Sequence, residues 1–231
     1  MKKKKSLKKL LTALILFSGF IIFTLAVKVV DVQAIGPNGS EVGFAALNGF
    51  IFELLGTNDF CYKLTKLLGY LSFLVAGLFA LKGLMQWVRK KSLKKVDYRL
   101  LLLACFYVLM LVFYLLFEKL VINYRPVITD EAQGLEASYP SSHTMLLLCI
   151  MGSAYMLLPR YLNGMSAFIG RIACVIMMIA MPVGRLLSGV HWFTDIIGSI
   201  LLSAALISLY AAALGIVAQK RKKKKKHRQR A

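Results

Sequence analysis

Six apolar stretches, each long enough to cross a lipid bilayer as a helix, constrain this chain of 231 residues more than any other feature. A spanning helix needs about 20 mostly apolar residues. The stretches lie at about residues 10–30, 67–87, 99–121, 142–158, 168–187 and 193–217. Hydrophobic residues make up 58% of the chain, more than a soluble domain can bury. The sequence therefore predicts an all-α integral membrane protein with six transmembrane helices.

The basic residues gather on one side of these stretches. With the N-terminus inside, 23 of the 30 Lys and Arg residues fall on the cytoplasmic side, whereas Asp97 is the only one of the ten acidic residues there. Because the Lys and Arg bias sets orientation, we expect both termini inside, at a plasma membrane. The net charge of +20 is then explained by topology anchors on an anionic leaflet rather than by a nucleic-acid partner.

The domain organisation follows from the same pattern. We expect a basic cytoplasmic N-terminus over residues 1–9, a six-helix membrane domain over 10–217 and a basic cytoplasmic tail over 218–231. The N-terminus also resembles a signal peptide, with small residues at Val32-Gln33-Ala34 as a cleavage site. A signal peptide has an apolar core of about 7 to 15 residues, so the longer run at 10–30 favours a retained helix.

Four cysteines carry no pattern that indicates chemistry. Cys105, Cys149 and Cys174 fall in the expected spans and Cys61 in an outer loop, and no Cys-x-x-Cys spacing occurs. We expect neither a disulfide framework nor cysteine catalysis.

A long outer segment, residues 31–66, separates the first and second spans. Its centre, residues 41–56, is apolar but interrupted by Glu41, Asn48 and Glu53, so it is too short and too polar to span. We expect an interfacial helix lying in the membrane plane. Such a helix would either gate lipid entry or serve only for packing, and the sequence leaves both open.

Distinctive polar residues gather at the outer ends of the last four spans. A second outer loop, about 123–139, carries the solvated charges Asp130, Glu131 and Glu136 between two groups of them. Charged groups at a membrane boundary are costly unless they are paired or solvated, so a cluster predicts function. The cluster comprises Lys119, Arg125, Pro126, Ser141, Ser142, His143, Arg185, His191 and Asp195.

The types and spacings of these residues indicate phosphoryl transfer. His191 and Asp195 share a helical face at i, i+4, so the carboxylate can orient the imidazole and leave its other nitrogen free to attack. Arg125 and Arg185 offer planar forks for phosphate oxygens, and Lys119 a point charge. These groups would neutralise the charge of the transition state.

Pro140-Ser141-Ser142-His143 opens a helix, so backbone N–H groups there would face an anion. Ser141 suits an N-cap or phosphate donor, and His143 suits a general acid. Taken singly, each of these groups could also have a purely structural role, as a snorkelling arginine, a helix cap or a structural hydrogen bond. A metal site of His143, His191 and Asp195 is the rival chemistry, but the cations around it would repel a metal.

Three spaced motifs make the sequence resemble the type 2 phosphatidic acid phosphatase superfamily of integral membrane lipid phosphatases. That family carries Lys-x6-Arg-Pro, Pro-Ser-Gly-His and Ser-Arg-x5-His-x3-Asp. Here the third motif is Gly184-Arg185 followed by His191 and Asp195, and the second has Ser142 in place of Gly. The first ends at Arg125-Pro126, but Glu118 occupies the lysine position and Lys119 lies one residue later, about 100° around the helix.

The resemblance implies roles for the matching residues. His191 would become transiently phosphorylated with support from Asp195, and His143 would protonate the leaving oxygen. Arg125, Arg185, Ser141 and Ser142 would bind phosphate, and neither a metal nor a cofactor would be needed. The motifs span residues 118–195 of the expected membrane domain.

The substrate remains open at this point. An outward-facing site favours undecaprenyl pyrophosphate, the lipid carrier that a wall-building cell must recycle. Phosphatidylglycerophosphate and phosphatidate are alternatives that need the same catalytic residues. A non-catalytic lipid-binding protein on the same fold is the alternative of another class, and a soluble vanadate-dependent haloperoxidase is disfavoured by the six spans. The sequence indicates no nucleic-acid partner and leaves the oligomeric state undefined.

Overall fold

The computed structural model describes residues 2–129, 131–132 and 134–229, so Asp130 and the last two residues of the basic tail lie outside the described ranges. Among the described residues, six helices are long and apolar enough to span a membrane, which confirms the predicted fold class. These helices are α1 (Lys2–Val29), α3 (Asp59–Lys90), α4 (Tyr98–Lys119), α5 (Ser142–Tyr161), α6 (Gly164–Leu187) and α7 (Phe193–Arg228).

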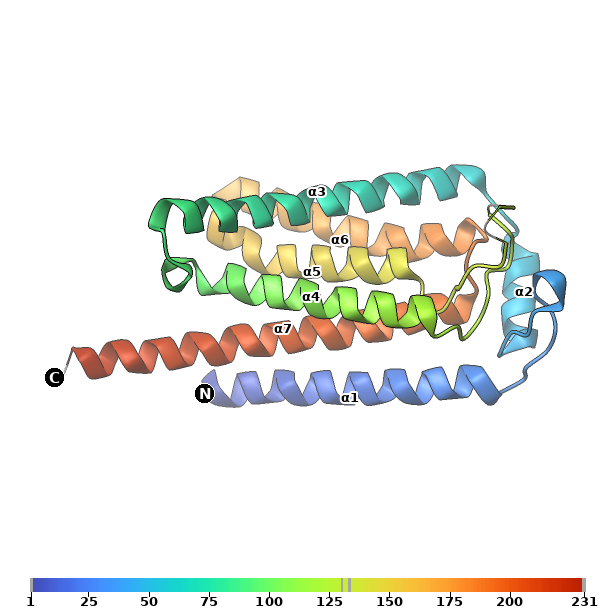
Figure 1. Ribbon diagram of the computed structural model, residues 1–231, viewed down its shortest axis with the longest axis horizontal. Coiled ribbons are helices and arrows are strands. Elements are labelled where there is room, and N and C mark those ends of the chain that lie inside the picture. Colours follow the sequence, from blue (N-terminus) through green and yellow to red (C-terminus); the bar gives the residue numbers. More distant parts are fainter. Residues whose placement is uncertain (1, 130, 133, 230–231) are drawn as a thin grey trace.

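The six helices form an elongated bundle with α5 at its centre (Figure 1). Helix α5 is the most buried of the six and packs against α3, α4, α6 and α7. Its sequence explains this position, because small and medium side chains such as Cys149, Gly152, Ser153 and Ala154 allow neighbours to approach closely. Helix α1 lies along α7 on the outside of the bundle, and both chain termini lie at the same end (Figure 1).

Several helix boundaries differ from the sequence prediction. Helix α3 begins at Asp59, eight residues before the expected start, because the Asn58 side chain caps it by accepting a hydrogen bond from the Cys61 backbone N–H at 2.9 Å. Cys61 therefore lies in the first turn of α3, and the prediction of a loop position was wrong. Helices α1 and α7 also continue through the basic ends of the chain.

The interfacial helix between the first two spans is present as α2 (Ala45–Leu55). It lies across the end of the bundle opposite the two termini (Figure 1). The side chains of Phe50 and Leu54 are 64% and 68% exposed, as expected for a helix whose apolar face meets lipid. Two short 3₁₀ turns, η1 (Pro37–Gly39) and η2 (Leu93–Lys95), complete the connections.

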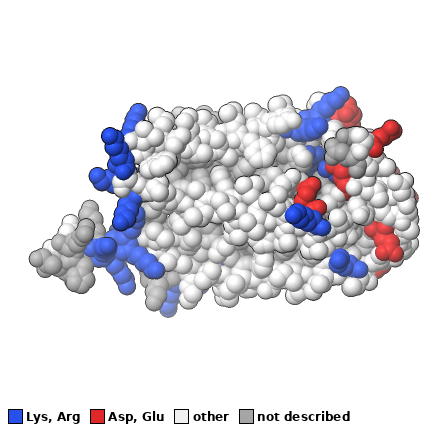
Figure 2. Space-filling view, in the orientation of Figure 1, with Lys and Arg blue, Asp and Glu red and all other residues white. Residues whose placement is uncertain are grey.

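The charges are distributed along the long axis of the bundle. Figure 2 shows Lys and Arg side chains crowded at the end that holds the two termini, whereas the acidic side chains in this view gather toward the end capped by α2. On the face shown, the middle of the bundle carries hardly any charged side chains, as a bilayer core requires (Figure 2). We call the terminus-bearing end the basic end and the other the motif end, because the residues of the three motifs described above lie at the latter.

Candidate active site

Two segments of the loop between α4 and α5 pair with each other and place Asn123 opposite Ser138 and Arg125 opposite Glu136. The Ser138 N–H donates to the Asn123 carbonyl at 2.9 Å, and the Arg125 N–H donates to the Glu136 carbonyl at 3.1 Å. An antiparallel bridge joins Tyr124 to Ala137 between them. The pairing fixes this loop at the motif end, although its sequence shows no strand pattern.

A hydroxyl group links the two residues predicted to form the catalytic pair. His191 Nδ1 lies 3.7 Å from Asp195 Oδ2, too far for a direct hydrogen bond. The Ser138 hydroxyl lies 3.1 Å from His191 Nδ1 and donates to Asp195 Oδ2. The expected direct contact is thus replaced by a bridge, because α7 begins at Phe193, after the histidine, and the i, i+4 helical geometry does not apply to His191.

The bridge determines which ring nitrogen of His191 is free. A hydroxyl has one proton, and Ser138 donates its proton to Asp195 Oδ2, so the Ser138 oxygen accepts from His191 Nδ1–H. The other nitrogen, Nε2, then carries the lone pair. This is the tautomer that a nucleophilic imidazole needs, and it leaves Nε2 available for attack.

The Asp195 carboxylate accepts hydrogen bonds from three residues, Ser138 and Asn123 of the α4–α5 loop and Trp192 of its own helix turn. Its Oδ2 accepts from the Trp192 backbone N–H at 2.8 Å, and its Oδ1 lies 3.4 Å from Asn123 Nδ2. Asp195 is fully buried, so these donors offset the cost of removing a charge from water. Asn123 also accepts from the Gly43 N–H at 3.4 Å, which ties the first outer segment to the same carboxylate.

The second motif is anchored by the tyrosine that precedes it. The Tyr139 ring stacks on Phe20 of α1, and its hydroxyl is 2.8 Å from Thr24 Oγ1. On α7, a Cβ added at Gly198 would lie only 2.6 Å from the Tyr139 ring, so the close packing depends on glycine there. The buried Ser141 follows at the N-cap position of α5, but its hydroxyl contacts Thr144 Oγ1 at 3.0 Å rather than capping the helix.

Helix α3 forms one wall of the site. An added Cβ at Gly69 would lie 3.7 Å from His143 Cδ2, and the Arg185 guanidinium lies 5.6 Å from the centre of the Tyr62 ring. An added Cβ at Gly184 would lie 2.6 Å from Thr65 Cγ2, which leaves no room for a larger residue. The departure from serine at the start of the third motif is therefore explained by the close approach of α3.

Unpartnered nitrogen atoms concentrate where these elements meet. Within the described ranges, seven buried side-chain polar atoms lack a hydrogen-bond partner, and five of them belong to four predicted site residues. The five are Arg125 Nε, His143 Nδ1, Arg185 Nε, Arg185 Nη2 and His191 Nε2. A buried donor without a partner costs about 1–3 kcal/mol. A cluster of such groups, with Arg185 only 1% and His191 only 3% exposed, suits a compact anion with several oxygens.

Burial and neighbouring cations also set the protonation state of the candidate nucleophile. Burial lowers the pKa of His191 well below its ordinary value of 6.5, and the charges of Arg185 and Arg125 lower the pKa further. The imidazole therefore stays neutral at physiological pH, as the tautomer deduced above requires.

Arg125 is oriented by an acidic partner. Its Nη2 forms an ion pair with Glu136 Oε2 at 3.0 Å, and its Nη1 donates to Thr129 Oγ1 at 2.9 Å. The Thr129 hydroxyl donates to Glu136 Oε1 at 2.6 Å. This arrangement fixes the fork of Arg125 while its Nε remains without a partner among the described residues.

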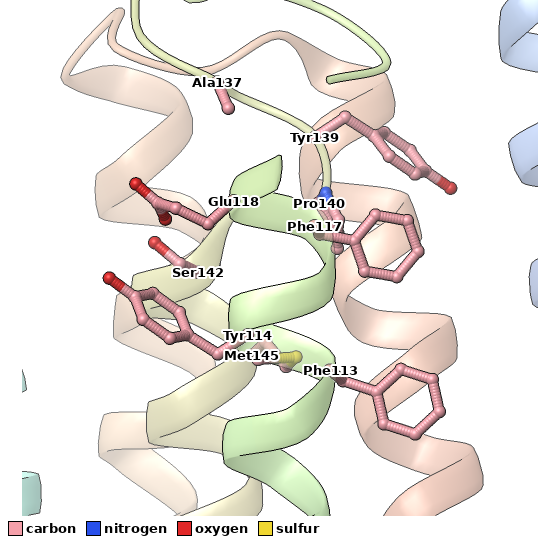
Figure 3. Close-up of a pocket in the computed structure, with 9 residues that line it drawn as sticks. All are labelled: Phe113, Tyr114, Phe117, Glu118, Ala137, Tyr139, Pro140, Ser142 and Met145. Carbon is pink, nitrogen blue, oxygen red and sulfur yellow. The ribbon is translucent and has the colours of Figure 1, made fainter. Parts of the chain in front are cut away.

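Glu118 occupies the lysine position of the first motif, and Lys119 follows it. Lys119 is the exposed last residue of α4, and Glu118 lines a small cavity of about 20 Å³ between α4 and α5. Figure 3 shows the polar ends of Tyr114, Glu118 and Ser142 on one side of this cavity and the rings of Phe113, Phe117 and Tyr139 on the other. A cavity of this size holds about one water molecule and not a lipid headgroup.

A lysine of α3 lies closer to the chemistry. The Lys66 ammonium sits 4.9 Å from the centre of the same Tyr62 ring that Arg185 approaches. Lys66 was not predicted as a site residue because it fell in the expected outer segment. Ser138 and Asn123 were not predicted because isolated polar residues in a loop carry no spacing signal.

No group of three His, Cys, Asp or Glu side chains that could hold a metal ion occurs among the described residues. The side chains that face the site are instead mostly cationic, and the predicted independence from metal ions stays a prediction.

The fold and the site together define a multi-pass membrane protein whose motif end holds a buried, cation-rich cluster. Residues 99–216 match the model of the PAP2 superfamily, and the chain belongs to this family. Family membership supports its assignment as a lipid phosphatase. The match covers the region from α4 to α7, which contains all eight of the predicted catalytic and phosphate-binding residues.

Comparison with solved structures shows the same architecture. The chain is similar to a Bacillus subtilis protein described as the first transmembrane PAP2 type phosphatidylglycerolphosphate phosphatase, with a TM-score of 0.55 and 19% sequence identity. The likeness covers 87% of this chain and 94% of that chain. No curated protein matches the chain.

Proposed function

We propose that this protein removes the terminal phosphate from a lipid phosphate or pyrophosphate through a phosphohistidine intermediate on His191. The observation that carries the proposal is the convergence of unpartnered buried nitrogens from Arg125, His143, Arg185 and His191. Two guanidinium groups suit phosphate oxygens, and a neutral imidazole with a free Nε2 suits attack on phosphorus.

The proposed reaction has two steps. In the first, His191 Nε2 forms a bond to phosphorus while the bond from phosphorus to the leaving lipid oxygen breaks, and His143 protonates that oxygen. In the second, water attacks the phosphohistidine, His143 takes up a water proton, and inorganic phosphate leaves. Ser138 and Asp195 stabilise the positive charge on the His191 ring through Nδ1–H, and the two arginines stabilise the equatorial oxygens.

Undecaprenyl pyrophosphate is the substrate that we favour, with undecaprenyl phosphate as the product. Lys and Arg side chains crowd at the basic end, and such residues favour the cytoplasmic side of a membrane. The motif end would then face the outside of the plasma membrane, where the spent carrier is released.

Phosphatidylglycerophosphate is the second candidate. The Bacillus subtilis protein to which this chain is similar is a phosphatidylglycerolphosphate phosphatase, and the structural likeness extends over most of both chains. Both lipids present a terminal phosphate on an apolar anchor, so the cluster of nitrogens serves either one. Phosphatidate, with the same terminal group, is the third lipid to compare.

Phosphate release by the purified protein in detergent tests the proposal. The three lipids are compared in the presence of EDTA, with the His191→Ala variant as the control. We expect release that persists in EDTA and disappears in the variant, and acid-labile ³²P on the wild-type chain after a brief reaction with labelled lipid. Release by the variant would refute the assignment of the nucleophile. A folded wild type that releases phosphate from none of the lipids would favour a non-catalytic lipid-binding role.

A further inference from the structure

A large cavity opens at the basic end of the bundle, at the opposite end from the candidate active site. Its volume is about 490 Å³, and it lies between the ends of α1, α4, α5, α6 and α7. A second cavity of about 490 Å³ shares Lys9, Tyr98 and Arg99 with the first and extends to Lys222. We call the two together the basic cavity.

All the charged side chains that line the basic cavity are basic. They are Lys9, Arg99, Arg160, Arg171 and Lys222, and no Asp or Glu of the described chain lines either part. The nearest carboxylate, Asp97, is already engaged by Arg99 at 3.3 Å and by Arg160 at 3.9 Å. Within the described ranges, Lys9 and Arg171 have no acidic partner, so the cavity holds uncompensated positive charge.

Arg171 is fixed in place and keeps one donor free. Its guanidinium lies 4.0 Å from the centre of the Tyr155 ring, and its Nη2 donates to the Tyr155 hydroxyl. Its Nε is buried without a partner among the described residues. A Cβ added at Gly215 of α7 would clash with the Ser6 hydroxyl of α1, so glycine allows the two helices to pack closely beside the cavity. An ordered guanidinium with a spare donor, beside a second cation on α1, is suited to a phosphate group.

We propose that the basic cavity binds the phosphodiester headgroup of an anionic phospholipid. The cavity opens where the bundle meets the polar face of the bilayer, so a headgroup can enter while its acyl chains lie along the apolar surface of the helices. Its volume falls within the range of small-molecule sites, about 300–1,000 Å³. A lipid held there contacts Lys9 of α1 and Arg171 of α6 at once, and so joins the first helix to the rest of the bundle.

Lipid retention by the purified protein, measured by native mass spectrometry, tests this site. The wild type, transferred from mixed phosphatidylglycerol and phosphatidylcholine nanodiscs, is expected to retain phosphatidylglycerol selectively. The double variant Lys9→Gln/Arg171→Gln is expected to lose that selectivity by about tenfold or more, since two charge-assisted contacts disappear. The control, Lys94→Gln/Lys95→Gln, removes the same amount of positive charge from η2, which lies at the same end but outside the cavity. This variant is expected to keep the selectivity for phosphatidylglycerol.

Further arms separate this site from other sources of binding. Arg185→Gln is expected to retain phosphatidylglycerol, because that change affects only the motif end. Equal losses in the Lys94/Lys95 control would overturn the proposal in favour of diffuse surface charge. Displacement of the lipid by millimolar inorganic phosphate would overturn it in favour of a free-anion site. The unfolding midpoint in phosphatidylcholine checks folding; if the double variant is destabilised there, Lys9→Gln alone, which changes an exposed side chain, must show the same loss of selectivity.

Discussion

Ser138 occupies the position between the His191 ring and the Asp195 carboxylate, so each of its contacts aligns the candidate nucleophile. Replacing Ser138 with Ala removes the acceptor for His191 Nδ1–H and one donor to a buried carboxylate. We expect kcat to fall about 10- to 100-fold, with a small change in KM. Steady-state kinetics with the preferred lipid measure this. Ser138→Thr keeps the hydroxyl and is expected to restore much of the rate, whereas full activity of Ser138→Ala would show that the bridge has no role.

The low pKa of His191 has a consequence for the pH dependence of the reaction. The proposed nucleophile is the neutral imidazole, and burial with Arg185 and Arg125 keeps it neutral below its ordinary pKa of 6.5. We therefore expect kcat/KM to stay level as the pH falls through 6.5 and to decline only at lower pH. The unfolded chain binds this proton near pH 6.5, so the contribution of His191 to stability decreases as the pH falls below that value. An acidic limb centred above 6.5 would contradict the assignment.

Because the first motif lacks its lysine, we expect substitutions of Lys66 and Lys119 to have different effects. Lys66 shares the Tyr62 ring with Arg185, whereas Lys119 is the last residue of α4 and lies one position beyond the lysine position of the motif. We expect Lys66→Gln to raise KM about tenfold, in line with the loss of one charged contact to phosphate, and Lys119→Gln to have little effect. Parallel kinetic assays of the two variants compare them directly. A larger effect on KM from Lys119→Gln would assign the role of the motif lysine to Lys119 of α4.

At the scale of elements, α2 is fastened beside the nucleophile by one buried amide. Asn48 Nδ2 donates to Thr194 Oγ1 at 2.9 Å, the Thr194 N–H donates to Asn48 Oδ1 at 3.2 Å, and Phe52 packs on Trp192. Asn48→Ala is expected to lower the unfolding free energy by about 1–3 kcal/mol and to raise KM, because buried groups lose partners and the turn at His191 loses support. Thermal unfolding and kinetics measure the two effects. Glu53→Ala on the same helix is the control, and equal effects of both changes would contradict a specific tie.

The elements that the sequence predicted well are those that the membrane dictates. An apolar run must be helical inside a bilayer, so the six spans could be read from hydropathy alone. Their ends could not, since α3 starts from a polar cap at Asn58 and carries Lys63 and Lys66 before its apolar run begins. The motif spacing located His191 and Asp195, but the bridging Ser138 depends on the pairing of two loop segments. That pairing is set by tertiary contacts such as the Tyr139 anchor, which no local pattern reveals.

At the scale of the whole molecule, the charge distribution predicts the orientation. We expect the motif end outside and the basic end inside, because Lys and Arg residues resist translocation. In a variant with its four cysteines replaced, a new cysteine at Asp59 should react with a membrane-impermeant maleimide on intact cells. One at Lys94 should react only after permeabilisation. Labelling in the reverse order would place the site on the cytoplasmic side.

The side-by-side packing of α1 and α7 also bears on how the protein is made. Among the described elements, this pair has the most extensive contact in the bundle, although its members stand at the two ends of the chain. Helix α1 precedes the other five spans and α7 is the last of them, so α1 must wait in the bilayer until α7 has been inserted. His191 lies just before α7 and Asp195 lies in its first turn, so the candidate site would be completed only when α7 is in place. An incomplete translation product would contain neither the finished bundle nor a partly active enzyme.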